Sequence, residues 1–133
     1  MRKFIIAGFV VVLLIICAFL FWPHSRIPSD KVIRENISGT WVIDFSRGAH
    51  STIVVGADGG YVCRITGANG RVAATLEGTF AVTNGYLVET TTKSSIANAR
   101  VPATSRSRIV RADGHEISYT NDNGPVVMRK VAR

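Results

Sequence analysis

Residues 71–94, RVAATLEGTFAVTNGYLVETTTKS, decide the fold, because two strand-like runs flank the pair Asn84-Gly85. Asn-Gly tolerates the positive φ angles of a type I′ turn, so this pair predicts a tight hairpin. The first run alternates apolar residues with polar or small ones, and the second is rich in β-branched residues, both typical of strands. Gly78 interrupts the first run and predicts a bulge or a bend. The apolar positions of the first run are Val72, Ala74, Leu76, Phe80 and Val82.

The same period of two continues on both sides of this hairpin, from residue 39 to the end of the chain. Turn-forming glycine, asparagine and aspartate residues separate the runs every 8–12 residues or so, a spacing typical of barrels and sandwiches. We therefore predict an all-β domain of about eight antiparallel strands in an up-and-down meander, either a barrel or a sandwich. The other runs are GTWVIDF (39–45), STIVV (51–55), YVCRIT (61–66), RSRIVRA (106–112), EISYTN (116–121) and PVVMRKV (125–131).

Alternation also assigns an inward face to these strands. A barrel of this size is just wide enough for its own side chains or for one small ligand, so its interior is either packed or occupied by such a ligand. A ligand would contact the large aromatic side chains of the inward set, which are Trp41, Phe45, Tyr61, Phe80 and Tyr119. The other predicted inward residues are Ile43, Ile53, Val55, Ile65, Leu76, Val82, Ile109, Ile117 and Met128.

Residues 4–22, FIIAGFVVVLLIICAFLFW, contain no charged residue and no proline. As a helix rising about 1.5 Å per residue, this stretch would span roughly 28 Å, close to the hydrocarbon thickness of a bilayer. A cleaved signal peptide would need a small-x-small exit, which residues 20–23, LFWP, lack. A lipoprotein signal would need a small residue before Cys17, where an isoleucine stands instead. We therefore predict an uncleaved single-pass anchor.

The charges beside this stretch predict its orientation. Arg2 and Lys3 precede it directly and only Arg26 follows closely, so the positive-inside rule keeps the N-terminus in the cytoplasm. The predicted organisation is an anchor in the inner (cytoplasmic) membrane (1–22), a linker with a short helix (23–38), and a β domain on the periplasmic or extracytoplasmic side (39–133).

The chain carries a formal charge of +7, which favours contact with anionic lipid headgroups. We predict no nucleic-acid partner, because the basic residues are scattered, no aromatic residues interleave with them, and the predicted compartment holds no nucleic acid. Residues 94–105, SSIANARVPATS, form the longest predicted loop, and arginines gather in it and after it. These arginines either contact an anionic lipid or partner, or form a solvated face. They are Arg100, Arg106, Arg108 and Arg111.

No pattern of catalytic or metal-binding residues is visible. The three histidines show no zinc-ligand spacing, and no nucleophile elbow or phosphate-binding motif occurs. Asp58, Asp113 and Asp122 lie beside glycine or asparagine, which is typical of turn formers. Cys63 alternates with apolar strand residues, which predicts a buried and inert thiol. We predict that the protein is not an enzyme and that it holds no metal and no cofactor.

A short predicted helix leads into Gly39-Thr40-Trp41 at the first strand, and Arg129 lies in the last strand. This arrangement resembles the Gly-x-Trp opening of the lipocalins, and the meander with glycine-rich hairpins is similar to the small bacterial lipocalin-like domains. The resemblance implies structural roles for Gly39, Trp41 and Arg129, in which the tryptophan closes the bottom of the barrel and the arginine packs over it. It also implies a small apolar ligand or a lipid inside the barrel.

These observations leave two functions open. The first is a membrane-anchored lipocalin-like domain that binds a small apolar ligand or lipid at the cell envelope. The second is a non-catalytic accessory subunit of an envelope assembly, with a packed interior, no ligand and an envelope protein as its partner. In that case an edge strand, loop 94–105 or the face of Arg106 and Arg108 would carry the contact.

Overall fold

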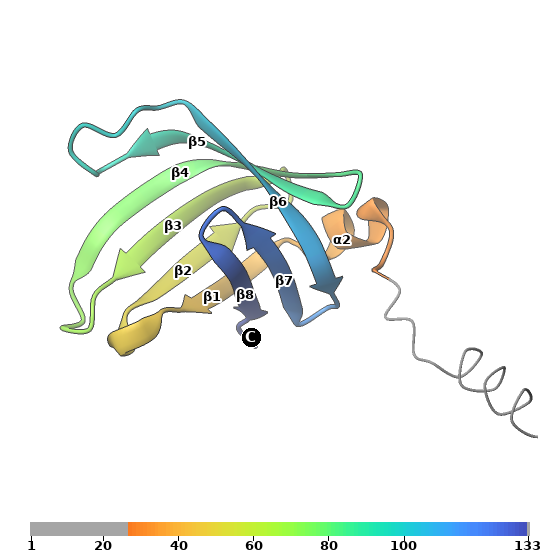
Figure 1. The fold of residues 1–133 in the computed structure, drawn as a ribbon, viewed down its shortest axis with the longest axis horizontal. Helices are drawn as coiled ribbons and strands as arrows, with labels where there is room; N and C mark the ends of the chain where they lie inside the picture. The colour runs from red at the N-terminus through yellow and green to blue at the C-terminus, as the bar shows by residue number, and fades with distance from the viewer. Residues whose placement is uncertain (1–26, 133) are drawn as a thin grey trace, which may run out of the picture.

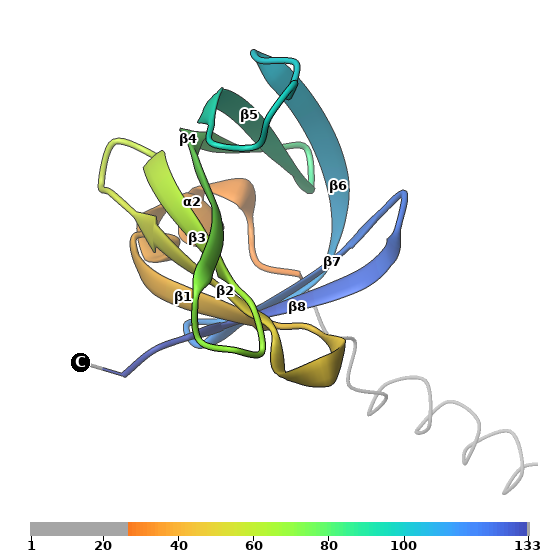
Figure 2. The same ribbon diagram turned by 90° about the vertical axis from the view of Figure 1, so that its left-hand side faces the viewer.

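The hairpin predicted at Asn84-Gly85 is present, with positive φ angles of 52° and 77° at these two residues. The computed structural model describes residues 27–132, in which each strand pairs antiparallel with the next along the chain and the last strand returns to the first. The result is a closed barrel of eight strands with a short helix at one end (Figures 1 and 2), which confirms the predicted all-β meander. The elements are α2 (Asp30–Asn36), β1 (Gly39–Asp44), the 3₁₀ turn η1 (Ser46–Gly48), β2 (His50–Val55), β3 (Gly60–Thr66), β4 (Val72–Thr83), β5 (Tyr86–Ser94), β6 (Ala103–Ala112), β7 (Glu116–Asn121) and β8 (Gly124–Lys130).

Strand β4 carries the predicted bulge. Its register against β5 shifts between Glu77 and Gly78, and the strand curves around the barrel in Figure 1. A Cβ atom at Gly78 would overlap the carbonyl oxygen of Thr90 on β5. The bend therefore requires a residue without a side chain, as expected where two backbones approach this closely.

The barrel is closed at the end where α2 lies. Trp41 and Met128 are both 0% exposed there and form the centre of the apolar core. The indole Nε1 of Trp41 donates a 2.7 Å hydrogen bond to the carbonyl oxygen of Ile37, just after α2. Ile33 and Ile37 are buried in the same core, so α2 and the residue that follows it cap this end of the barrel. We call it the closed end.

Helix α2 is tied to the β4–β5 turn by its first residue. The carboxylate of Asp30 accepts hydrogen bonds from the backbone nitrogens of Asn84 (2.6 Å) and Gly85 (3.0 Å). A helix of seven residues is too short to be stable by itself, so it depends on such contacts and on its buried isoleucines.

Lys130, and not Arg129, covers Trp41. Lys130 lies opposite Trp41 in the β1–β8 register, and its Nζ lies 5.2 Å from the centre of the tryptophan ring. The same Nζ donates a 2.8 Å hydrogen bond to the carbonyl oxygen of Asn36. Gly39, at φ 128°, leaves room for this side chain, because a Cβ there would lie 2.7 Å from Cε of Lys130.

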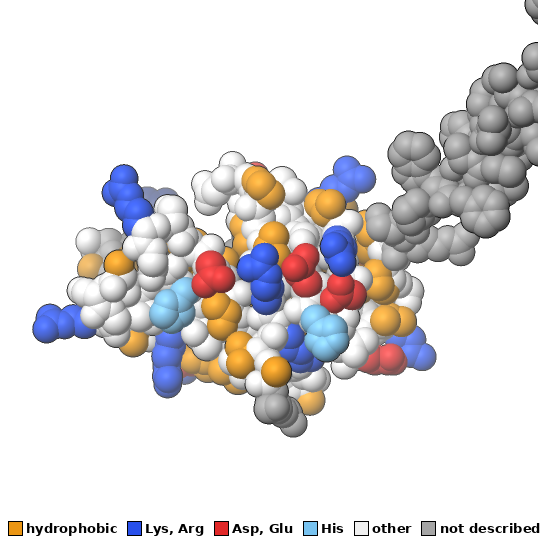
Figure 3. Space-filling view, turned by 90° about the horizontal axis from the view of Figure 1, so that it is seen from below, with side chains coloured by type: hydrophobic (Ala, Val, Ile, Leu, Met, Phe, Trp, Pro, Cys, Tyr) orange, Lys and Arg blue, Asp and Glu red, His pale blue; other side chains and the backbone are white. Residues whose placement is uncertain are grey.

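The role that the lipocalin resemblance implied for Arg129 is therefore wrong for this chain. Arg129 lies opposite Val42, on the outer face, since neighbouring residues of a strand point to opposite sides of a sheet. Its guanidinium lies 3.8 Å from the carboxylate of Asp44 and 3.5 Å from that of Glu116. Figure 3 shows acidic and basic side chains alternating along this outer face.

Phe45 is also misplaced by the sequence pattern, because it is 46% exposed and does not enter the barrel. Strand β1 ends at Asp44, and the chain then turns through η1, so the alternation stops one residue before Phe45. The remaining predicted inward residues are buried, except that Ile65 and Leu76 are only partly buried against the core.

The predicted anchor, residues 1–22, lies outside the described residues. Within residues 27–132, no helix has both the length and the apolar character needed to cross a membrane.

Candidate functional site

The wall of the barrel is incomplete beside β6. This strand pairs with β7 only from Arg108 to Ala112, so its first half, residues 103–107, has a backbone partner in β5 alone. Figures 1 and 2 show the β5–β6 hairpin projecting beyond the shorter β7–β8 hairpin. Glu89 and Thr91, the inward residues of β5 opposite this unpaired part of β6, therefore lie where the wall is incomplete, and we call this part of the barrel the open end.

The side chains that meet at the open end include an aromatic pair. The rings of Tyr61 on β3 and Phe80 on β4 stack with centroids 4.5 Å apart and an interplanar angle of 24°. Both residues are buried, and Glu89 on β5 lies directly opposite Phe80 in the ladder. Cross-strand partners share a face of the sheet, so the Glu89 carboxylate faces the barrel interior.

Glu89 is held by a short hydrogen-bond chain. The Tyr61 hydroxyl donates a 2.7 Å hydrogen bond to Oε1 of Glu89. The same hydroxyl lies 2.9 Å from Oγ1 of Thr91, which leaves the threonine as the donor in that contact. The pKa of Tyr61 is raised, mainly by burial. Its hydroxyl therefore stays protonated and donates its hydrogen to Glu89. Glu89 and Thr91 are both partly exposed, so solvent reaches the polar end of the chain.

Tyr119 contributes a second hydroxyl, from a strand far along the chain from Tyr61. It lies on β7, opposite Ile109 and Val126, and is 8% exposed. Burial, followed by the negative charges of Glu89 and Cys63, raises the pKa of Tyr119 to about 12. Its hydroxyl makes no hydrogen bond to another described residue, and no buried side-chain oxygen or nitrogen in residues 27–132 lacks a partner, so this hydroxyl is accessible to solvent and to a molecule that enters.

Cys63 lies on the same inner face of β3, two residues after Tyr61. It is a free and buried thiol whose Sγ lies 2.9 Å from Oγ of Ser51 on β2. Burial raises the pKa of Cys63, which disfavours the reactive thiolate. The predicted burial of Cys63 is therefore confirmed.

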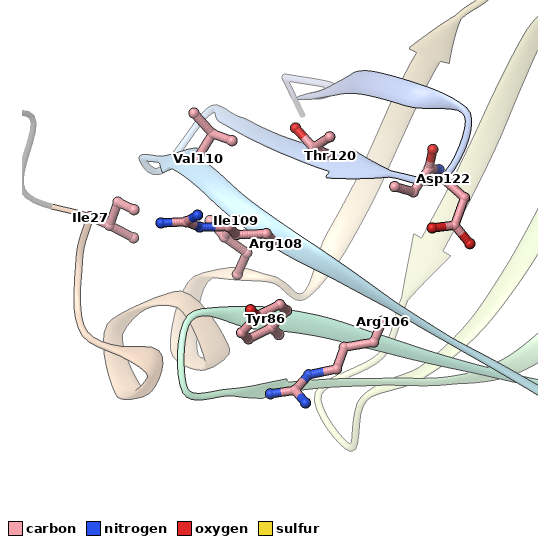
Figure 4. Close-up of a pocket in the computed structure, with 9 residues that line it drawn as sticks. Ile27, Tyr86, Arg106, Arg108, Ile109, Val110, Thr120 and Asp122 are labelled. Atoms are coloured by element: carbon pink, nitrogen blue, oxygen red, sulfur yellow. The ribbon is translucent and has the colours of Figure 1, made fainter.

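A second feature is an open groove of about 650 Å³ on the outside of the barrel, shown in Figure 4. Arg106 and Arg108 lie on its β6 wall, and the guanidinium of Arg106 lies 3.9 Å from the centre of the Tyr86 ring. Ile27, the first described residue, lines the same groove. Figure 4 shows the Arg108 side chain extending toward Ile27, away from Asp122 on the far side.

The structure separates the four predicted arginines. Arg106 and Arg108 share the outer groove, as alternation required, because they lie opposite Val88 and Tyr86 in the β5–β6 ladder. Arg111 is displaced by a register shift in β6 and pairs with Asp113 at 3.3 Å. Arg100 lies in the β5–β6 loop, outside both strands.

Of the five aromatic residues predicted to line a ligand, the structure keeps three in the barrel interior near Glu89. Tyr61, Phe80 and Tyr119 are buried there, whereas Trp41 plugs the closed end and Phe45 lies outside the barrel. The pattern missed Glu89, although one signal for it exists. Leu87 and Glu89 are two residues apart on one strand, so a buried Leu87 places the carboxylate inward.

Comparison with protein-family models and with curated proteins identifies no relative. No protein-family model matches the chain, and no curated protein matches it significantly. The eight-stranded antiparallel barrel itself is consistent with a lipocalin-like fold. Within residues 27–132, no three side chains of histidine, cysteine, aspartate or glutamate gather as a metal site would require.

Proposed function

We propose that the protein is a non-catalytic, lipocalin-like binding domain that takes a small, mainly apolar ligand at the open end of its barrel. One observation carries the proposal, namely the change in character along the interior. At the closed end the side chains are apolar and sealed by Trp41 and Met128. At the open end, partly exposed Glu89 and Thr91 and the unpartnered hydroxyl of Tyr119 face inward beside stacked aromatic rings. Polar groups placed in an apolar site are typical of ligand recognition.

Two neighbouring threonines offer a matched test. Thr91 faces inward and contacts Tyr61, whereas Thr90 faces outward and lies 3.2 Å from the Thr104 hydroxyl. A tryptophan at Thr91 would fill the open end, and a tryptophan at Thr90 would extend into solvent. We expect native mass spectrometry of the full chain, released from detergent, to find a co-purifying small molecule on the parent protein and on Thr90→Trp, but not on Thr91→Trp. A parent protein that carries none, and that takes up none of a panel of small apolar compounds, would contradict the proposal.

On this proposal the barrel is held at the extracytoplasmic side of the inner membrane by residues 4–22. The support is the uncharged stretch itself and the basic residues Arg2 and Lys3 before it. Alkaline phosphatase fused after Arg133 should be active and green fluorescent protein fused there should be dark. The reverse pattern would place the barrel in the cytoplasm and would contradict the orientation.

The outer groove favours a second candidate, an accessory subunit that contacts an envelope partner. Arg106 and Arg108 supply positive charge there, and exposed Val110 supplies apolar surface. A photo-crosslinking residue at Arg108 should capture a defined envelope protein in intact cells, and the same residue at exposed Val54, on β2, serves as control. Capture of no protein from the groove would leave the binding domain as the only supported function.

A further inference from the structure

We infer that the ligand of the open end is a cationic amine, a small molecule with an apolar body and a protonated amino group that the Glu89 carboxylate receives. This inference rests on the proposed function and names the chemical class of its ligand. The alternatives were a neutral apolar molecule and a fatty-acid-like lipid. The charge of the site decides among the three.

Glu89 is a carboxylate without a cation. The chain has sixteen lysines and arginines, and acidic residues such as Asp44, Glu77 and Glu116 each have one of these cations beside them. Among the described residues, none forms an ion pair with Glu89. In a protein with this excess of positive charge, an inward carboxylate without a counter-ion is a site for an external cation.

The hydrogen bonds around Glu89 leave one of its two carboxylate oxygens without a donor. Tyr61 occupies Oε1, and Thr91 fixes the Tyr61 hydroxyl on its other side, so the carboxylate is oriented. Within residues 27–132, nothing donates a hydrogen bond to Oε2. An ammonium group could donate one hydrogen to Oε2 and a second to the Tyr119 hydroxyl, which makes no hydrogen bond to another described residue and is accessible to solvent. A charge-assisted bond of this kind is about twice as strong as a neutral one.

The aromatic rings favour the same class of ligand. Tyr61 and Phe80 present a stacked pair at the site, and the faces of such rings attract cations. A primary amine is protonated at neutral pH, as the lysine side chain is. A fatty acid would bring a second carboxylate against Glu89 and would be repelled, whereas a neutral alcohol would gain only an ordinary hydrogen bond. The expected order of affinity is therefore amine, then alcohol, then carboxylate.

Three probes of equal length test this order, namely hexylamine, hexanol and hexanoate. Each is titrated by calorimetry into the full chain in a nonionic detergent, with detergent alone as the blank. We expect hexylamine to bind at least about tenfold more tightly than hexanol, a difference of about 1.4 kcal/mol, and hexanoate to bind more weakly than either. Glu89→Gln should reduce the affinity for hexylamine to that for hexanol. Glu77→Gln, an exposed glutamate on the neighbouring strand, should leave the affinity for hexylamine unchanged.

The possible outcomes distinguish a failure of the amine assignment from a failure of the proposed binding function. If hexylamine and hexanol bind equally well to the parent protein, the amine assignment is wrong and the binding domain remains. If none of the three probes binds, both are wrong at this site. The comparison of probes on the parent protein holds even if Glu89→Gln does not fold, and Tyr119→Phe, which removes only the hydroxyl, should weaken hexylamine binding several-fold.

Discussion

Replacing Lys130 with methionine should destabilise the barrel more than replacing its neighbour Arg129 with methionine. Methionine keeps the apolar stem of either side chain and removes the charge. At position 130 the loss includes the 2.8 Å hydrogen bond to Asn36 and the contact with the Trp41 ring at 5.2 Å. At position 129 it includes only two exposed ion pairs, with nitrogen–oxygen distances of 3.8 and 3.5 Å.

The magnitudes follow from these contacts. A hydrogen bond from a charged donor at a partly exposed site contributes about 1 kcal/mol, and an exposed cation–π contact adds about 0.5 kcal/mol, so Lys130→Met should cost about 1.5 kcal/mol. Exposed ion pairs contribute about 0.2–1 kcal/mol each at best and often nothing measurable, so Arg129→Met should cost about 0.5 kcal/mol. For a domain of this size, the difference of about 1 kcal/mol corresponds to a gap of roughly 4–8 °C in Tm.

Thermal unfolding of the full chain, followed by near-ultraviolet circular dichroism, measures this gap. Adding salt provides a further check, because screening should remove the small effect of Arg129→Met while most of the effect of Lys130→Met persists. If Arg129→Met lowers Tm by more than Lys130→Met does, the assignment of Lys130 as the cover of Trp41 is refuted. The role implied by the lipocalin resemblance would then apply after all.

Three other substitutions probe separate parts of the fold. Asp30→Ala removes the two hydrogen bonds to the backbone nitrogens of residues 84 and 85 and should lower the free energy of unfolding by about 1–3 kcal/mol in denaturant titrations. Gly78→Val, which drives a side chain into the backbone of Thr90, should prevent a soluble barrel from forming, whereas Gly70→Val in an open turn should still fold, as circular dichroism would show. Because the pKa of Tyr119 is raised to about 12 from an ordinary 10, folding favours its protonated form, so the stability it contributes is complete below pH 10 and is lost as the pH rises through 12. Tyr119→Phe should therefore shift the alkaline unfolding midpoint upward, and an unchanged midpoint would count against the buried placement.

The period of two predicted most of this fold because it is a local signal. It shows which residues of a strand share a face, and an Asn-Gly pair marks where the chain reverses, so the eight strands and nearly all inward residues follow from neighbours in the sequence. It does not show how the last strand meets the first. The choice between Arg129 and Lys130 depends on the register of β8 against β1, across a separation of nearly ninety residues, and no local pattern fixes it.

The exposure of Phe45 and the separation of Arg111 from the other arginines have a related cause. In both places the alternation is broken by backbone geometry, by the turn η1 after Asp44 and by the register shift in β6. Arg47 in that turn has a φ angle of 66°, which a sequence pattern does not reveal for an arginine. Glu89 was missed for another reason. A charged residue in a strand is normally assigned to the outer face, but both its spacing from Leu87 and its pairing with Phe80 place Glu89 inward.

The two ends of the barrel therefore have different physical tasks. Trp41, Lys130 and the contacts of α2 hold the closed end together, so the open end need not be optimised for stability. A partly buried carboxylate without a counter-ion weakens a folded protein, because its lost hydration is not fully replaced. A ligand that supplies the missing cation would convert that lost free energy into binding affinity. Glu89 should accordingly be a position where a substitution such as Glu89→Leu raises Tm while it abolishes binding, which is the opposite of what a purely structural residue would do.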